Sequence, residues 1–297
     1  MDGDDQMAQD KVFPEEFGFH FSQGNFGRIY RQTVKDFRLS MGEDEFVKSA
    51  ENFNDGAGTF SLKGSNQLEP GIKRYQWVAE ESGRMIITAF NNAGEIIGIQ
   101  FDIYEKFDSD REVTINSYRV PFTGEWFVLW GGNDSFLNYH YSHKHQRYAY
   151  DFIKKEDGAA CSGDPQQLLS YHAFGEDVVA PRAGKVVHVI KDVEDNEPHR
   201  MNSVSPEGNC IILEHGYNEY TMLAHLREHS ITVEVGDEVE WGHKLAQCGN
   251  SGASDTPHLH FHVMNGSHPY EADSIRIQFA DGREPKQGDT VKGRTRI

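Results

Sequence analysis

Residues 257–263 read Pro-His-Leu-His-Phe-His-Val, and this short segment constrains the fold more than any other. Side chains two apart in a β-strand point to the same face, so His258, His260 and His262 share one face and the apolar residues between them share the other. Three neighbouring imidazoles pack poorly in an apolar core but suit a metal ion. We therefore predict a strand that separates a core from a metal-binding face; an exposed histidine face is the structural alternative.

A second source of ligands lies well upstream. Residues 148–152 read Tyr-Ala-Tyr-Asp-Phe, a strand-like run that sets the carboxylate of Asp151 among aromatic side chains. Burying a carboxylate without a partner is costly, and a cation would supply that partner. Two histidines and one aspartate make a three-ligand zinc site that leaves a fourth position for water, as in hydrolytic zinc centres. The pKa of water bound in this way falls to about 7, which gives a nucleophile at neutral pH.

Length and charge narrow the class of protein. A chain of 297 residues can form two domains, and its net charge of −18 argues against nucleic acid as a partner, because that binding needs clustered Lys and Arg. No apolar run is long enough to predict a membrane span. The first ten residues are acidic, and they show no secretory signal. Of 15 histidines only His20 precedes residue 140, so we expect the chemistry in the second half.

The first part of the chain, residues 1–110, is predicted to be a small α+β accessory domain. Apolar residues recur at helical spacing over 14–41, with a break near Gly24, and a second helix is expected over 43–53. Short strand-like runs then follow at residues 59–63, 72–80, 84–90 and 95–104. This order weakly resembles the NTF2-like domains that precede some wall peptidases. It carries no catalytic constellation, so a binding, spacing or solubilising role is expected.

The second part, residues 111–297, is predicted to be an all-β, mostly antiparallel β-sandwich. Residues 178–187 and 233–245 each read as a strand, a turn and a strand, which are the building blocks of such a fold. Residues 274–280 alternate between apolar and polar side chains and are expected to add an edge strand.

Several motifs in this second part occur in a characteristic order. They are Gly-Asn-Cys-Ile-Ile-Leu-Glu-His-Gly at 208–216, Tyr-Thr-Met-Leu-Ala-His-Leu at 220–226, Gly-Asn-Ser-Gly at 249–252 and His-Leu-His-Phe at 258–261. Together they resemble the lysostaphin-type (LytM-like) zinc metallopeptidases, which are peptidoglycan endopeptidases. The resemblance extends over about residues 135–265.

The resemblance implies roles for individual residues. His260 and Asp151 fall on zinc ligands, whereas His258 and His225 fall on the two catalytic imidazoles, whose division of roles stays open. Most members carry their first zinc histidine four residues before the aspartate, where this chain has an arginine. A subset has Asn-Tyr-His further upstream, a pattern that falls on His140.

The region around that first ligand leaves alternatives. His143 and His145 remain candidates beside His140 for the first zinc ligand, with a loop or hairpin expected to return the imidazole to the metal. Of the other histidines, His215 is interpreted as structural and His262 is expected at the rim of the site.

The sequence thus predicts a zinc-dependent endopeptidase that hydrolyses the peptide cross-links of bacterial peptidoglycan with a metal-activated water. An extracytoplasmic location, in the cell envelope or secreted, follows from that substrate. One alternative is a non-catalytic lysostaphin-type domain that binds the wall or activates a hydrolase. Another is a lipoyl- or biotinyl-like carrier, which would give the histidines no role.

Overall fold

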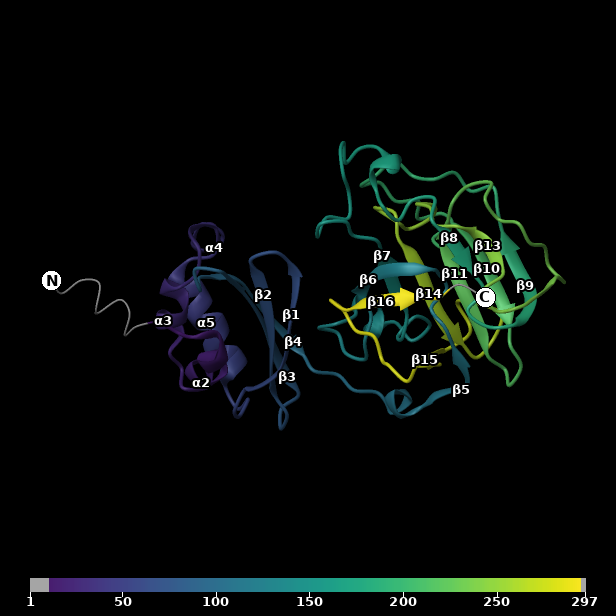
Figure 1. The fold of residues 1–297 in the computed structure, drawn as a ribbon. Coiled ribbons are helices and arrows are strands. Elements are labelled where there is room, and N and C mark those ends of the chain that lie inside the picture. Colours follow the sequence, from purple (N-terminus) through teal and green to yellow (C-terminus); the bar gives the residue numbers. More distant parts are fainter. Residues whose placement is uncertain (1–10, 295–297) are drawn as a thin grey trace. The chain divides into compact units, whose positions relative to one another are not determined.

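The computed structural model describes residues 11–294, which form two compact units, the first ending at Glu105 and the second beginning at Lys106 (Figure 1). Residues 1–10, on which the expectation about a secretory signal rests, lie outside the described residues. Within the described range, none of the helices has the length and apolar character needed to cross a membrane.

Helices open the first unit. They are η1 Pro14–Glu16, α2 Phe17–Ser22, α3 Phe26–Arg31, α4 Lys35–Ser40 and α5 Glu43–Asn54. The predicted break falls where Gly24 adopts a positive φ of 74°, a conformation that glycine reaches without steric cost. The helix predicted over 43–53 corresponds to α5.

A four-stranded antiparallel sheet completes this unit, in the order β1-β2-β3-β4. Its strands are β1 Ser61–Glu69, β2 Ile72–Ala79, β3 Arg84–Asn91 and β4 Ile96–Ile103. Phe17 and Phe21 of α2 pack with Trp77 of β2 in one aromatic core. The unit is therefore an α+β domain; its likeness to NTF2-like domains stays a prediction.

The second unit is β-rich and mostly antiparallel, as predicted. Its strands are β5 Val113–Tyr118, β6 Gly124–Trp130, β7 Tyr150–Ile153, β8 Asp177–Val179, β9 Gly184–Ile190, β10 Asn209–Glu214, β11 Tyr220–Leu226, β12 Glu238–Val239, β13 Lys244–Gln247, β14 Leu259–Met264, β15 Ser274–Phe279 and β16 Thr290–Gly293. Short 3₁₀ turns lie at η2 Asp108–Arg111, η3 Tyr139–Ser142 and η4 Leu168–Ser170. The main sheet runs β12-β9-β10-β11-β14-β7-β6-β16, and β13 pairs with β8 in a second, two-stranded sheet.

The two strand-turn-strand segments pair with each other rather than within themselves. From the first segment, β8 pairs with β13 and β9 pairs with β12, so each segment contributes one strand to each sheet. Neither segment is a simple hairpin. The segments are thereby tied together across the two sheets.

The expectation of an edge strand at 274–280 is wrong. Strand β15 lies between two partners, because it pairs antiparallel with β14 and parallel with β5. One of its polar side chains, Arg276, donates to the Glu284 carboxylate at 2.9 Å. Alternation of side chains shows which face is buried but does not show whether a strand has one neighbour or two.

Strand β14 divides the interior as the histidine pattern predicts. Leu259, Phe261 and Val263 all lie in the main core, and each is fully buried. The opposite face of β14 is also covered, since Met264 packs in a smaller cluster with Met222 of β11. The histidine side chains on this face are buried as well.

Candidate metal centre

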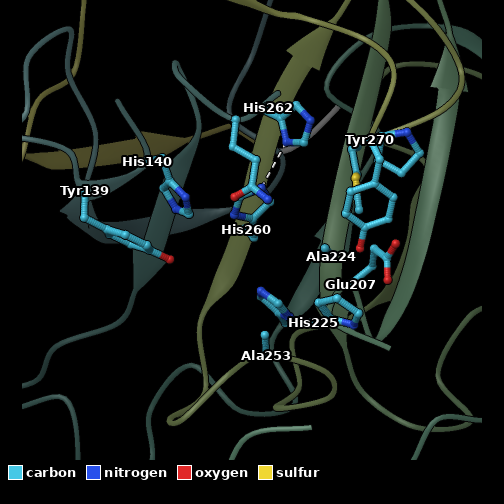
Figure 2. A pocket seen from close by; sticks show the side chains of 13 residues that line it. Tyr139, His140, Glu207, Ala224, His225, Ala253, His260, His262 and Tyr270 are labelled. Atoms are coloured by element: carbon cyan, nitrogen blue, oxygen red, sulfur yellow. Dashed lines mark hydrogen bonds between the residues drawn. The ribbon is translucent and has the colours of Figure 1, made fainter. Parts of the chain in front are cut away.

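Three neighbouring strands set the floor of the site. Asp151 of β7 lies directly opposite His260 of β14, and His260 lies opposite Ala224 of β11. Directly opposed residues in a sheet share a face, so the carboxylate and the imidazole meet side by side. Alanine on the third strand leaves the space beside His260 open, and both residues line a pocket (Figure 2).

A short loop brings the imidazole of His140 next to Asp151 and His260. His140 lies in η3, and its Nε2 is 2.9 Å from Asp151 Oδ2. Asn138 shapes the loop: its side-chain oxygen accepts from the His140 backbone N–H, and its amide donates to the carbonyls of Arg147 and Ala149. Because Asn138 is fully buried, these bonds hold the loop without competition from water.

Arg147, four residues before Asp151, braces the same loop. Its guanidinium lies 3.3 Å from the centre of the Phe107 ring, and its Nε donates to the Tyr141 carbonyl at 3.0 Å. The hydroxyls of Tyr141 and Tyr148 both donate to the Asp110 carboxylate at 2.7 Å. Arg147 therefore stabilises the turn that carries His140.

His140, Asp151 and His260 form the group of side chains best placed to share a cation among the described residues. Their ligand atoms lie within 4.8 Å of one another, and all three residues are buried. His260 Nδ1 approaches Asp151 Oδ1 to 2.9 Å, so two imidazoles converge on one carboxylate. Burial alone would raise the pKa of Asp151, yet the His140 and His258 rings and the hydrogen bonds from His140 and His260 hold that pKa well below its usual range.

These donors fit zinc. Two imidazole nitrogens and a carboxylate oxygen are the ligand types that zinc takes in catalytic sites. A buried carboxylate that faces two imidazoles also needs a compensating positive charge, which a divalent cation would supply. The alternatives for the first ligand lie elsewhere: His143 is exposed, and His145 Nδ1 bonds to the Ala272 carbonyl at 2.9 Å.

His225 reaches the pocket through an unusual backbone conformation. It follows Ala224 in β11, so regular alternation would point it away from the site. Its φ of 59° lies in the left-handed region, where non-glycine residues are uncommon and cost about 1–3 kcal/mol. Both Ala224 and His225 consequently line the pocket.

A glycine turn fixes the orientation of the His225 ring. Gly252 has a φ of 79°, and a Cβ at this position would overlap the Gly208 backbone, so the two segments touch. This contact sets the Ser251 carbonyl 2.9 Å from His225 Nδ1. A carbonyl can only accept, so Nδ1 carries the hydrogen and Nε2 is left with the lone pair. Burial, followed by the nearby His258 and His260 rings, holds the pKa of His225 well below 6.5.

His258 is oriented in the same manner. Its Nδ1 lies 2.9 Å from the Thr256 carbonyl and 3.1 Å from Ser254 Oγ. Nε2, the nitrogen with the free lone pair, is 3.8 Å from Asp151 Oδ1. The His225 and His258 ring centres are 4.7 Å apart, so two imidazoles of one tautomer stand beside the candidate ligands.

The expectation that His262 lies at the rim is wrong. The residue is 1% exposed, and its Nδ1 is 3.0 Å from His260 Nε2 (Figure 2). Burial and the His260 ring keep the pKa of His262 well below its usual value. Its place on the histidine face was predictable; its enclosure by neighbouring segments was not.

Other residues around the pocket carried no clear signal in the sequence. Tyr139, Glu207 and Tyr270 line the pocket, and they come from three separate loops (Figure 2). The Tyr270 hydroxyl hydrogen-bonds to the Glu207 carboxylate, and burial and this carboxylate raise the pKa of Tyr270. The adjacency of Tyr139 to His140 was the one available hint.

His215 lies outside this site, as the sequence interpretation held. Its Nδ1 is 2.8 Å from the Ala183 carbonyl, and its Nε2 is 2.8 Å from Thr221 Oγ1. Both ring nitrogens are thus satisfied by the fold. Burial lowers the pKa of His215 to about 4.

Comparison with known proteins finds peptidases similar to part of the second unit. Residues 168–272 match the model of Peptidase family M23. Peptidoglycan DD-endopeptidase ShyA of Vibrio cholerae is 30% identical over 80 residues, which cover 27% of this chain and 18% of that protein. An uncharacterized metalloprotease of Buchnera aphidicola is 39% identical over 56 residues, covering 19% and 14% of the two chains. The chain thus spans less than a fifth of the length of these curated relatives.

Among solved structures, the catalytic domain of the antimicrobial peptidase lysostaphin from Staphylococcus simulans is 24% identical. The match covers 43% of this chain and 74% of that one, with a TM-score of 0.28. Residues 168–272 of the second unit thus match a peptidase family, and the predicted resemblance to lysostaphin-type (LytM-like) peptidases is confirmed. The matched segment includes His225, His258 and His260 but begins after His140 and Asp151.

Proposed function

We propose that the chain is a zinc-dependent endopeptidase that hydrolyses peptide cross-links of bacterial peptidoglycan. The observation that carries the proposal is the convergence of His140, Asp151 and His260, whose ligand atoms lie within 4.8 Å of one another beside two further imidazoles. The match of residues 168–272 to a peptidase family and the similarity to a peptidoglycan endopeptidase support the reaction and the substrate. Work on that substrate would put the protein in the cell envelope or outside the cell.

The proposed ligands are His140 through Nε2, His260 through Nδ1, and the Asp151 carboxylate. Zinc held by three such side chains polarises a carbonyl and lowers the pKa of water to about 7. The chain supplies the proton transfers. His225 and His258 each offer a bare Nε2, because a backbone carbonyl holds the hydrogen on Nδ1.

In the proposed reaction, one of these imidazoles takes a proton from the attacking water as its oxygen bonds to the scissile carbonyl carbon. The resulting imidazolium is a hydrogen-bond donor through both nitrogens. It can return the proton to the leaving amine when the carbon–nitrogen bond breaks. The second imidazole would stabilise the oxyanion in its protonated form, because only then does its Nε2 carry a hydrogen to donate. Water and peptide thus become a carboxylic acid and an amine, with the imidazoles restored.

The α+β first unit is proposed to be an accessory domain. The candidate metal group comes entirely from the second unit, as far as the described residues show. A wall-binding or spacing role is compatible with a domain that contributes nothing to the reaction. Removing it should alter wall binding and leave hydrolysis of a soluble peptide in place.

A direct experiment measures zinc and hydrolysis together. Purified chain should hold about one zinc, lose activity on peptidoglycan when treated with chelator, and recover when zinc returns. Mass spectrometry of the digested wall identifies the new amino termini and hence the bond that is cut. Zinc binding without new amino termini would favour a wall-binding or activating module instead.

A further inference from the structure

His262 is a buried titratable residue on the histidine face to which the proposed reaction gives no part. It follows His260 by two positions in β14 and lies opposite Met222 of β11. It lines the pocket, yet its ring is 1% exposed. Its Nε2 is buried, and no hydrogen-bond partner for it exists among the described residues. Burying a polar ring lowers the stability of the fold unless its nitrogens form hydrogen bonds.

The contact that His262 makes is with the rear of the His260 ring. His262 Nδ1 is 3.0 Å from His260 Nε2, whereas His260 Nδ1, on the other edge of the ring, is 2.9 Å from Asp151 Oδ1. His262 therefore does not reach the point where the three candidate ligands meet, and it is not among them. His262 thus contacts the proposed ligand His260 without being placed to bind the metal itself.

The position of one hydrogen decides what this contact does. A neutral imidazole carries a single N–H, so His260 can bind a metal through Nδ1 only when its hydrogen is on Nε2. That Nε2–H needs an acceptor, and His262 Nδ1 is in place to accept it. With the opposite arrangement, His262 would donate and His260 would hold its hydrogen on Nδ1, where it points at Asp151 and blocks coordination.

We propose that His262 is a positioning residue, which accepts a hydrogen bond from His260 Nε2–H and so fixes the tautomer in which His260 Nδ1 binds zinc. The inference rests on the proposed function, since it concerns the same metal centre. Partners of this kind orient metal-bound histidines, and losing one typically weakens metal affinity by about 10–100-fold.

Two substitutions separate the hydrogen bond from the shape of the side chain. His262→Leu removes the acceptor and keeps an apolar side chain of moderate size, so the zinc dissociation constant should rise by about 10–100-fold. His262→Gln keeps an oxygen that can accept from His260, so most of the affinity should return. His243→Leu, at an exposed histidine, is the matched control and should bind zinc as the wild type does. Competition with a calibrated chelator gives the dissociation constants.

Nitrogen NMR of the histidine rings reads the tautomers directly. In the zinc-loaded wild type, the hydrogen should lie on Nε2 of both His260 and His262. Finding it on His262 Nδ1 would overturn the inference, and so would wild-type zinc affinity in His262→Leu. If the wild-type chain itself binds no zinc, the proposed function fails and this inference falls with it. A wild-type chain that binds zinc beside an unaffected leucine variant overturns the inference alone.

Discussion

The candidate site has two halves that are built differently. Asp151 and His260 lie on paired strands, where the sheet register sets their side chains side by side. His140 and His225 reach the same place without that help, one from a short loop and the other through a left-handed backbone conformation. The first half depends on hydrogen bonds of the sheet, and the second depends on individual side chains and turns.

This difference teaches where the site should be fragile. Strand positions are fixed by many backbone hydrogen bonds, so single substitutions there remove a functional group and leave its surroundings intact. Loop positions rely on a few braces such as Asn138 and Arg147. Losing one brace should move a ligand that is itself unchanged. The following variants test this contrast, beginning with the largest effect.

Asp151→Asn should produce the largest loss. The substitution keeps the size of the side chain on β7 but removes the charge between His140 and His260. Zinc content should fall close to zero and hydrolysis by about 10³-fold or more, because the anion and the metal chemistry disappear together. Elemental analysis and a peptidoglycan digestion assay measure the two. Asp164→Asn, at an exposed position, should change neither.

His225→Ala should separate catalysis from metal binding. Removing a proton-transfer group typically costs about 10²–10⁴-fold in turnover, while zinc should stay near one per chain. Loss of zinc in this variant would make His225 a ligand and contradict its assigned role. His229→Ala is a matched control, because His229 also has a positive φ, 57°, but its side chain is exposed. Its turnover should equal that of the wild type.

Asn138→Ala should weaken the loop-borne half alone. The substitution removes the hydrogen bonds of Asn138 to two buried carbonyls and to the His140 N–H. The free energy of unfolding should fall by about 1–3 kcal/mol. Zinc affinity should fall by about tenfold, because His140 is no longer held in place. Thermal unfolding and chelator competition measure these.

Asn209→Ala is the comparison for that variant. Asn209 is equally buried and donates to the Val193 and Leu226 carbonyls, away from the three candidate ligands. It should lose similar stability and keep its zinc affinity. If both variants bind zinc equally well, the loop brace has no special part in presenting His140.

The smallest effect concerns a histidine outside both halves. The pKa of His215 is lowered to about 4 in the folded chain, against an unfolded value near 6.5. Between these values the unfolded state binds more protons, so the free energy of unfolding should fall as the pH drops from about 6.5 to 4. Denaturant titration of chelator-treated protein at several pH values measures the slope of the free energy of unfolding against pH. His215→Gln should flatten it; an unchanged slope would show that His215 titrates normally.

The sequence predicted the strand-borne half from physical pattern alone. Alternation placed His260 and His262 on one face of β14, with His258 directly before the strand, and the aromatic surroundings of Asp151 indicated a paired carboxylate. His140 and His225 came from family resemblance, because a loop return and a positive φ at a histidine leave no periodic signal.

Errors about the fold have the same origin. Strand content was readable in 178–187 and 233–245, but their pairing with each other was not, since pairing between distant segments depends on the whole fold. The role of β15 as an internal strand and the enclosure of His262 likewise depend on what packs around them.

Anomalous diffraction at the zinc edge, on crystals of the zinc-loaded chain, tests the central claim most directly. The account predicts one strong peak in contact with His140 Nε2, His260 Nδ1 and an Asp151 carboxylate oxygen, with no fourth protein side chain bound. A peak held by His143 or His145 instead of His140, a fourth side-chain ligand, or no peak at these three residues would contradict it.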